Sequence, residues 1–330
     1  MPDDPAAILD RATGCLLGLA VGDALGTTLE FTERDTRPHH TAMLGGGTFG
    51  LKPGEWTDDT AMALALGHSL VARGGLDPHD LMDRFVLWWR EGAYSCTGTC
   101  FDIGLTTRQA LTRYQRTGDP FAGATDPHTA GNGSLMRLAP VALWALDDAM
   151  AAAALARDQS RTTHATPQAV EACAFFVGLL RTALHGADKA AVLTPRLWRG
   201  HPEVADVAGG SWRTKERADI RSSGYVVATL EAALWAVART DSFADALILA
   251  VNLAGDADTV GAVTGQLAGA LHGARGIPPE WLAPLAWRTR LTDLAAALLT
   301  AEGRPRPALR HSPRAAGKSA KPPRNPSATR

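Results

Sequence analysis

Two short acidic segments, residues 56–60 and 255–259, each place two carboxylates beside threonine hydroxyls. Their oxygen-bearing side chains include Thr57, Asp58, Asp59, Asp256, Asp258 and Thr259. If the segments meet in the fold, these side chains form an oxygen-only ligand set, which suits Mg²⁺ or Mn²⁺. Carboxylates that converged without a cation would repel one another strongly. The pattern therefore favours a site for two divalent ions.

Two other interpretations of these segments remain open. Both segments precede helical sequence, and Asp and Thr are common N-cap residues, so a cap explains one acid in each segment but a second one less well. Asp256, Asp258 and Val260 also fit the Asp-x-Asp-x-Thr/Val pattern of haloacid-dehalogenase-type phosphatases. That motif ends a buried strand near the start of an α/β domain, whereas too little chain follows residue 256 to build such a sheet.

The elements that must position these acids are predicted to be helices. Apolar residues recur at helical spacing, and period-2 alternation of β-branched residues is almost absent, so we expect an all-α fold. Helices are predicted over residues 8–26, 60–72, 102–116, 134–156, 167–185, 224–239, 243–253, 258–272 and 286–301, with another from residue 78. The glycine-rich segment 30–56 is predicted to be a long irregular loop.

The first predicted helix carries glycine at every fourth position, at Gly14, Gly18 and Gly22. The three glycines lie along one side of the helix, and each costs about 1 kcal/mol of helix stability relative to alanine. We therefore expect another backbone to approach that side closely.

Composition places this 330-residue chain among globular proteins, with 45% hydrophobic and 20% charged residues. Its four cysteines form no Cys-x-x-Cys pair, and its acidic N-terminus does not resemble a signal peptide. No apolar run reaches the roughly 18 residues of a membrane span. We expect a cytoplasmic protein, most simply a monomer, without a membrane span.

Charge divides the chain into an acidic body and a basic tail. Residues 303–330 carry eight basic side chains, no acidic ones and many prolines, and we expect them to be disordered. Residues 1–302, expected to form one domain, hold 25 of the 33 basic and all 34 acidic residues. Nucleic-acid binding by this folded part is therefore not expected.

Taken together, a series of sequence blocks resembles the ADP-ribosylglycohydrolase family, and most of all its branch of dinitrogenase reductase-activating glycohydrolases. In chain order the blocks are GCLLG (14–18), GDALG (22–26), EF (30–31), WTDDT (56–60), TCFDIG (99–104), GNGSLMR (131–137), SRTTH (160–164), SSGYV (222–226) and NLAGDADT (252–259). Each block alone is a weak signal, but their order along the chain is specific.

The resemblance implies an all-α enzyme that removes ADP-ribose from a protein side chain by cleaving the glycosidic bond at the distal ribose. It implies that the six residues of the acidic segments hold two Mg²⁺ or Mn²⁺ ions. It also implies that Asp102, beside the scissile ribose, is the acid or base, and that Glu30 is a metal ligand or gate. The residues alone also allow Asp102 to cap the helix predicted over 102–116.

Substrate-binding residues are implied in three further blocks. The amides of Gly131-Asn132-Gly133-Ser134, expected at a helix start, would hold the diphosphate. His164 would contact the distal ribose or its leaving group, and Tyr225 would stack on adenine or on a guanidinium. For the glycine-rich segment an ordinary helix cap is the alternative, and for His164 and Tyr225 it is ordinary packing.

Two functions remain open from the sequence: the hydrolase, and a catalytically silent ADP-ribose-binding or structural protein on the same fold. The presence of every implied metal-site residue and of Asp102 favours the hydrolase, whose partner would be an ADP-ribosylated protein. Family members act on ADP-ribosyl-arginine, ADP-ribosyl-serine or O-acetyl-ADP-ribose, and the resemblance to the dinitrogenase reductase branch favours arginine.

Overall fold

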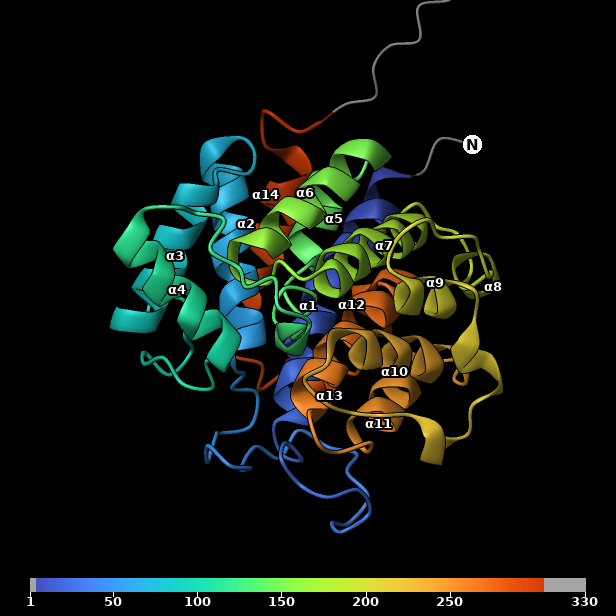
Figure 1. Ribbon diagram of the computed structural model, residues 1–330. Helices are drawn as coiled ribbons and strands as arrows, with labels where there is room; N and C mark the ends of the chain where they lie inside the picture. The colour runs from blue at the N-terminus through green and yellow to red at the C-terminus, as the bar shows by residue number, and fades with distance from the viewer. Residues whose placement is uncertain (1–3, 306–330) are drawn as a thin grey trace, which may run out of the picture.

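The computed structural model describes residues 4–305 and is all-helical over that range, as predicted (Figure 1). Its α-helices are α1 (Pro5–Gly26), α2 (Asp58–Arg73), α3 (Pro78–Glu91), α4 (Leu105–Thr117), α5 (Ala139–Trp144), α6 (Ala149–Thr163), α7 (Pro167–Leu184), α8 (Lys189–Val192), α9 (Pro202–Ala208), α10 (Val226–Ala238), α11 (Phe243–Val251), α12 (Ala257–His272), α13 (Pro279–Leu282) and α14 (Arg288–Thr300). Four short 3₁₀ helices join them: η1 (Pro127–Thr129), η2 (Ser211–Thr214), η3 (Arg217–Asp219) and η4 (Ala274–Gly276). Within residues 4–305, no helix is both long and apolar enough to span a bilayer.

Helices α1 and α12 pack backbone to backbone in the middle of the molecule (Figure 1). The facing pairs are Gly14 with Gly269, Gly18 with Gly265, and Gly22 with Gly261. A Cβ at any of these positions would overlap backbone atoms of the other helix. The close approach expected from the glycines of the first helix is confirmed, and the matching glycines of α12 repeat the same four-residue spacing.

The antiparallel α1–α12 pair brings two distant parts of the sequence together at one end. The chain leaving α1 pairs with the chain entering α12, since Phe31 N donates to Gly255 O at 2.7 Å and Gly255 N to Thr32 O at 3.0 Å. Glu30 therefore lies opposite Gly255, the residue before Asp256, although more than two hundred residues separate the two segments.

The glycine packing predicts that alanine substitution has opposite effects on stability at two helical glycines. Gly265→Ala should lower the free energy of unfolding by at least about 2 kcal/mol, because the new methyl overlaps the backbone of α1. Gly178→Ala, in α7, should raise it by up to about 1 kcal/mol, because that Cβ meets no heavy atom within 4 Å. Urea unfolding of both variants checks this, and equal stabilities would contradict the packing.

The single helix predicted over 134–156 is wrong. The structure has a turn after Asn132, then α5, a break, and α6. Asp148 causes the break, because its carboxylate caps α6 by accepting from Met150 N and Ala151 N, both at 3.0 Å. The short helices α8, α9 and α13 were not predicted.

At its C-terminal end the described chain runs slightly past residue 302. Arg304 lies against the body, where its Nε donates to Trp144 O at 3.1 Å. The rest of the predicted disordered tail lies outside the described residues.

Candidate active site

Asp23 of α1 holds the start of α2 in place. This buried carboxylate accepts hydrogen bonds from the backbone N and the hydroxyl of both Thr57 and Thr60, at distances between 2.6 and 3.0 Å. Burial raises the pKa of Asp23 to about 6, and these hydrogen bonds oppose the rise. Asp23 belongs to the block GDALG (22–26), but no role was predicted for it; an acid within the apolar, glycine-rich stretch 12–26 was the signal.

With the start of α2 fixed, the two predicted acidic segments meet. Thr57 Oγ1 lies 3.3 Å from Asp258 Oδ2 and 3.4 Å from Asp59 Oδ2, and Thr259 Oγ1 also lies 3.4 Å from Asp59 Oδ2. Asp58 lines the same cleft as Asp256, Asp258 and Thr259. The structure thus brings all six predicted metal-site residues together.

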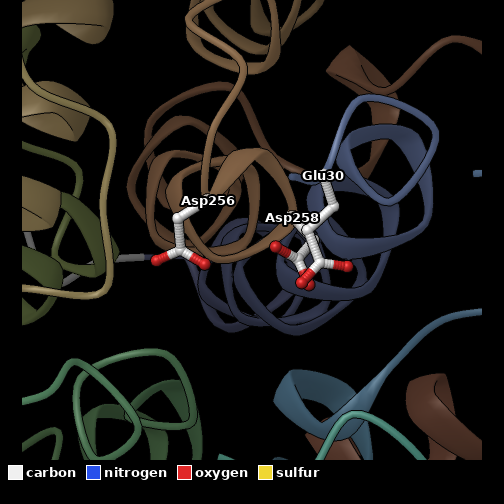
Figure 2. A group of neighbouring side chains, drawn as sticks. All are labelled: Glu30, Asp256 and Asp258. Atoms are coloured by element: carbon white, nitrogen blue, oxygen red, sulfur yellow. The ribbon is translucent and has the colours of Figure 1, made fainter. Parts of the chain in front are cut away.

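Glu30 joins this cluster from the chain that leaves α1. Its carboxylate and those of Asp256 and Asp258 each offer an oxygen within 4.8 Å of the others. Figure 2 shows the carboxylates of Glu30 and Asp258 close together, with Asp256 to one side of them. At such separations the three carboxylates are able to share one metal ion.

Neither competing interpretation of the acidic segments fits this geometry. The cap positions of α2 and α12 are Thr57 and Asp256, and neither side chain makes a capping hydrogen bond. The residues before Asp256 belong to α11 and a turn, not to the buried strand that the phosphatase motif requires. The acids are therefore placed to act together.

Electrostatically, the cluster is poised for a cation. Burial, followed by repulsion among the acids, raises the pKa values of Asp58, Asp59 and Asp258 well above the ordinary range and that of Glu30 to about 11. Within residues 4–305, three buried carboxylate oxygens have no hydrogen-bond partner, and all three belong to this cluster: Glu30 Oε2, Asp59 Oδ1 and Asp258 Oδ1. Carboxylate oxygens of this kind fit Mg²⁺ or Mn²⁺.

These raised pKa values predict how stability depends on pH without metal. The folded protein binds more protons than the unfolded chain, so its stability should fall as the pH rises from about 4, where unfolded carboxylates ionise, past about 7. A bound divalent cation should offset this loss. Melting temperatures with EDTA or Mn²⁺ across this range check the prediction, which fails if the Mn²⁺-induced rise does not grow with pH.

Asp102 lies against the cluster and does not cap α4. That helix begins at Leu105, and Gly104 occupies its cap position, so the cap interpretation is wrong. The Asp102 side chain is hydrogen-bonded with Asp258 and Glu30, and its backbone has φ +54°. Burial, then the negative charges of Asp23 and Asp256, raises its pKa to about 7, where a carboxyl can both give and take a proton.

A cleft of about 250 Å³ opens onto the cluster, and segment 131–133 forms part of its wall. Asn132 Nδ2 donates to Asp256 Oδ2 at 2.6 Å and to Thr229 Oγ1 at 2.9 Å, which orients that acid. Two of the backbone amides expected to hold a diphosphate already donate to backbone carbonyls: Gly131 N to Thr129 O and Asn132 N to Gly224 O. They are therefore not free to bind a phosphate in this structure. Ser134 is buried away from the cleft, hydrogen-bonded to Ser160.

His164 forms another part of the cleft wall, against the two glycines. A Cβ at Gly133 would lie 2.7 Å from the imidazole Cε1, so glycine makes room for the ring. Burial, then the nearby Arg137, lowers the pKa of His164 to about 3, so the ring is neutral. Arg137 donates to Thr163 Oγ1 at 2.9 Å, and that hydroxyl lies 2.9 Å from His164 Nδ1. We infer that the hydroxyl donates to Nδ1, leaving the proton on Nε2.

Tyr225 is a neighbour of the cleft but does not line it. Its backbone pairs with Gly131, whereas its hydroxyl donates to Glu203 Oε2 at 2.9 Å in an adjacent pocket of about 480 Å³. A thin wall, Ser223 and Gly224, separates the two spaces.

Comparison with known proteins agrees with this geometry. The sequence profile described as ADP-ribosylglycohydrolase matches residues 4–308. The chain is 49% identical to the ADP-ribosylarginine hydrolase Tri1 of Pseudomonas putida, over 88% of this chain and 78% of that one. It is 38% identical to the ADP-ribosyl-[dinitrogen reductase] glycohydrolase of Rhodospirillum rubrum, over 84% and 91%. A solved structure titled "ADP-ribosylglycohydrolase-related protein complex" matches with a TM-score of 0.80 and 46% identity, over 89% and 98%.

An all-helical domain with an acidic cleft between two helix N-termini, and with these relatives, is a hydrolase of the glycosidase class. The chain belongs to the ADP-ribosylglycohydrolase family.

Proposed function

We propose that this protein removes ADP-ribose from modified arginine side chains of proteins, in a reaction that depends on two divalent metal ions. The observation that carries the proposal is the set of partnerless buried carboxylate oxygens on Glu30, Asp59 and Asp258 beside the carboxyl group of Asp102. The arginine acceptor is supported by the names of the Pseudomonas putida relative and of a Serratia proteamaculans relative that is 45% identical.

The metal ligands proposed are the six residues of the acidic segments, with Glu30 at the edge of the site. These side chains offer carboxylate and hydroxyl oxygens only, the donor set of Mg²⁺ or Mn²⁺. When bound, the ions would bind ribose hydroxyls and lower the pKa of a water molecule. The positive ends of α2 and α12 point at the same place and further stabilise the negative carboxylates.

Asp102 is proposed as the general acid and base. A guanidine leaving the anomeric carbon needs a proton, and the attacking water must lose one. The contacts of its side chain with Glu30 and Asp258 at the edge of the acidic cluster support both roles for the Asp102 carboxyl.

The remaining wall of the cleft would hold the substrate. His164, neutral and protonated on Nε2, would donate a hydrogen bond to a sugar or phosphate oxygen. Asn132 would keep Asp256 oriented, and Gly131 and Gly133 would let the substrate approach the ring. Tyr225 lines the adjacent pocket, so it would contact a part of the substrate that extends out of the acidic cleft.

An acceptor comparison tests the proposal. Purified protein with Mn²⁺ is incubated separately with peptides that carry ADP-ribose on arginine or on serine and with O-acetyl-ADP-ribose, and the release of ADP-ribose is followed. We expect release from the arginine-linked substrate at a rate well above the others. Release only from serine or from the acetyl ester would overturn the acceptor, and binding of all three without release would favour the silent ADP-ribose-binding protein.

A further inference from the structure

A second groove, of about 580 Å³, runs along the exposed face of α4 and meets the acidic cleft at Leu105. Helix α4 lies beside α3 at one side of the molecule (Figure 1). Leu105 lines both the groove and the cleft and is 61% exposed. The groove therefore continues directly from the mouth of the active site.

All charged side chains that line this groove are arginines: Arg108, Arg113 and Arg116. Arg108 and Arg116, with Thr112 between them, recur every four residues and share one face of α4. Segment 105–117 contains no Asp or Glu, although residues 1–302 hold more acidic than basic side chains. The face of α4 is thus a basic stripe on an otherwise acidic body.

The structure of α4 itself does not explain this stripe. Arg113 donates to Ala122 O at 2.6 Å, but Arg108 and Arg116 make no side-chain ion pair or hydrogen bond among the described residues, in contrast to Arg84, which pairs with Asp80 at 2.6 Å. Arg108 also sits near the N-terminal end of α4, where the helix dipole disfavours a cation. The groove thus offers two unpaired guanidinium groups along its length and an exposed leucine at the end that meets the cleft, and arginine is enriched where proteins bind one another.

We propose that the α4 groove docks an acidic segment of the ADP-ribosylated protein. This proposal rests on the proposed function, because an ADP-ribose held in the cleft requires the protein that carries it to lie at the mouth, next to Leu105. Arg108 and Arg116 then pair with carboxylates that flank the modified arginine, and Leu105 packs against its neighbours. The enzyme would therefore select modified arginines in acidic surroundings.

The test compares substrates with and without flanking polypeptide. Wild-type protein is assayed on ADP-ribosyl-arginine alone and on ADP-ribosylated arginine peptides with acidic or neutral flanks. We expect Arg108→Glu/Arg116→Glu to raise KM for the acidic peptide by about 5–10-fold, with kcat and the small substrate unchanged. The wild-type preference for acidic flanks should shrink as salt rises from about 50 to about 300 mM.

Arg199→Glu/Arg288→Glu is the matched control, because it makes the same change in net charge at exposed arginines outside both grooves. The proposal is overturned if the control matches the α4 variant, if the α4 variant also loses affinity for ADP-ribosyl-arginine, or if single-stranded RNA binds the stripe and the acidic peptide does not compete. If the wild type releases nothing from ADP-ribosyl-arginine, the proposed function fails, and peptide binding by fluorescence anisotropy still decides the docking.

Discussion

Asp102→Asn is expected to lower the rate of ADP-ribose release by about 10²–10⁴-fold, the usual loss when general acid–base help is removed. Asparagine has nearly the same shape as aspartate but neither gives nor takes a proton at neutral pH. It also tolerates the left-handed backbone that Asp102 adopts at φ +54°. Steady-state kinetics on ADP-ribosyl-arginine measure the effect.

Two controls separate catalysis by Asp102 from folding. The melting temperature of Asp102→Asn should not fall below that of wild type, because the residue is not the cap of α4 and the change only relieves repulsion within the acidic cluster, and its Mn²⁺ binding should stay close to wild type. Asp102→Ala, by contrast, places an ordinary residue in left-handed backbone and should lower stability by about 1 kcal/mol or more. Near-normal turnover of Asp102→Asn would show that Asp102 is not the general acid and base, and another group in the cleft would have to transfer the proton.

Asp258→Asn is expected to lose both metal and activity. Removing even an outer partner of a metal ligand typically lowers affinity by about 10–100-fold, so loss of a ligand should exceed about 100-fold. Without metal, however, this variant should be more stable than wild type near pH 7, because it relieves repulsion from Asp256 and Asp102. Calorimetric titration with Mn²⁺ and melting curves in EDTA measure the two effects.

Asp293→Asn, at an exposed position of α14, is the matched control for Asp258→Asn. It should bind Mn²⁺ like wild type and melt at nearly the same temperature in EDTA. Should Asp258→Asn bind Mn²⁺ with unchanged affinity, Asp258 is not a ligand, and the metal site would have to be built from other acids.

The central packing of the fold could be predicted because glycine spacing is a local signal. Gly14, Gly18 and Gly22 indicate a close helix contact on their own, and the long helices follow from apolar periodicity. The break between α5 and α6 was missed because a strong apolar pattern continues across it. There the competing signal was Asp148, whose preference for a cap outweighs that pattern.

The ligand set of the site could likewise be predicted from residue type and spacing, but its assembly could not. Asp23 has no acidic or hydroxyl neighbour in the sequence, and its role appears only where α1 meets Thr57 and Thr60 across the fold. The same holds for Tyr225, whose side chain turns into a pocket next to the cleft because its backbone is paired with Gly131. Such contacts depend on tertiary packing, which a single sequence does not specify.

The central claim is that this chain is a metal-dependent hydrolase of ADP-ribosyl-arginine. The most direct measurement follows ADP-ribose release from ADP-ribosyl-arginine by EDTA-treated protein, before and after adding Mn²⁺, Mg²⁺ or Zn²⁺. The account predicts no release in EDTA and restored release with Mn²⁺ or Mg²⁺, with Zn²⁺ a poor substitute because the proposed ligands include no His or Cys. Full activity in demonstrably metal-free protein, or none with any of these ions, would contradict it.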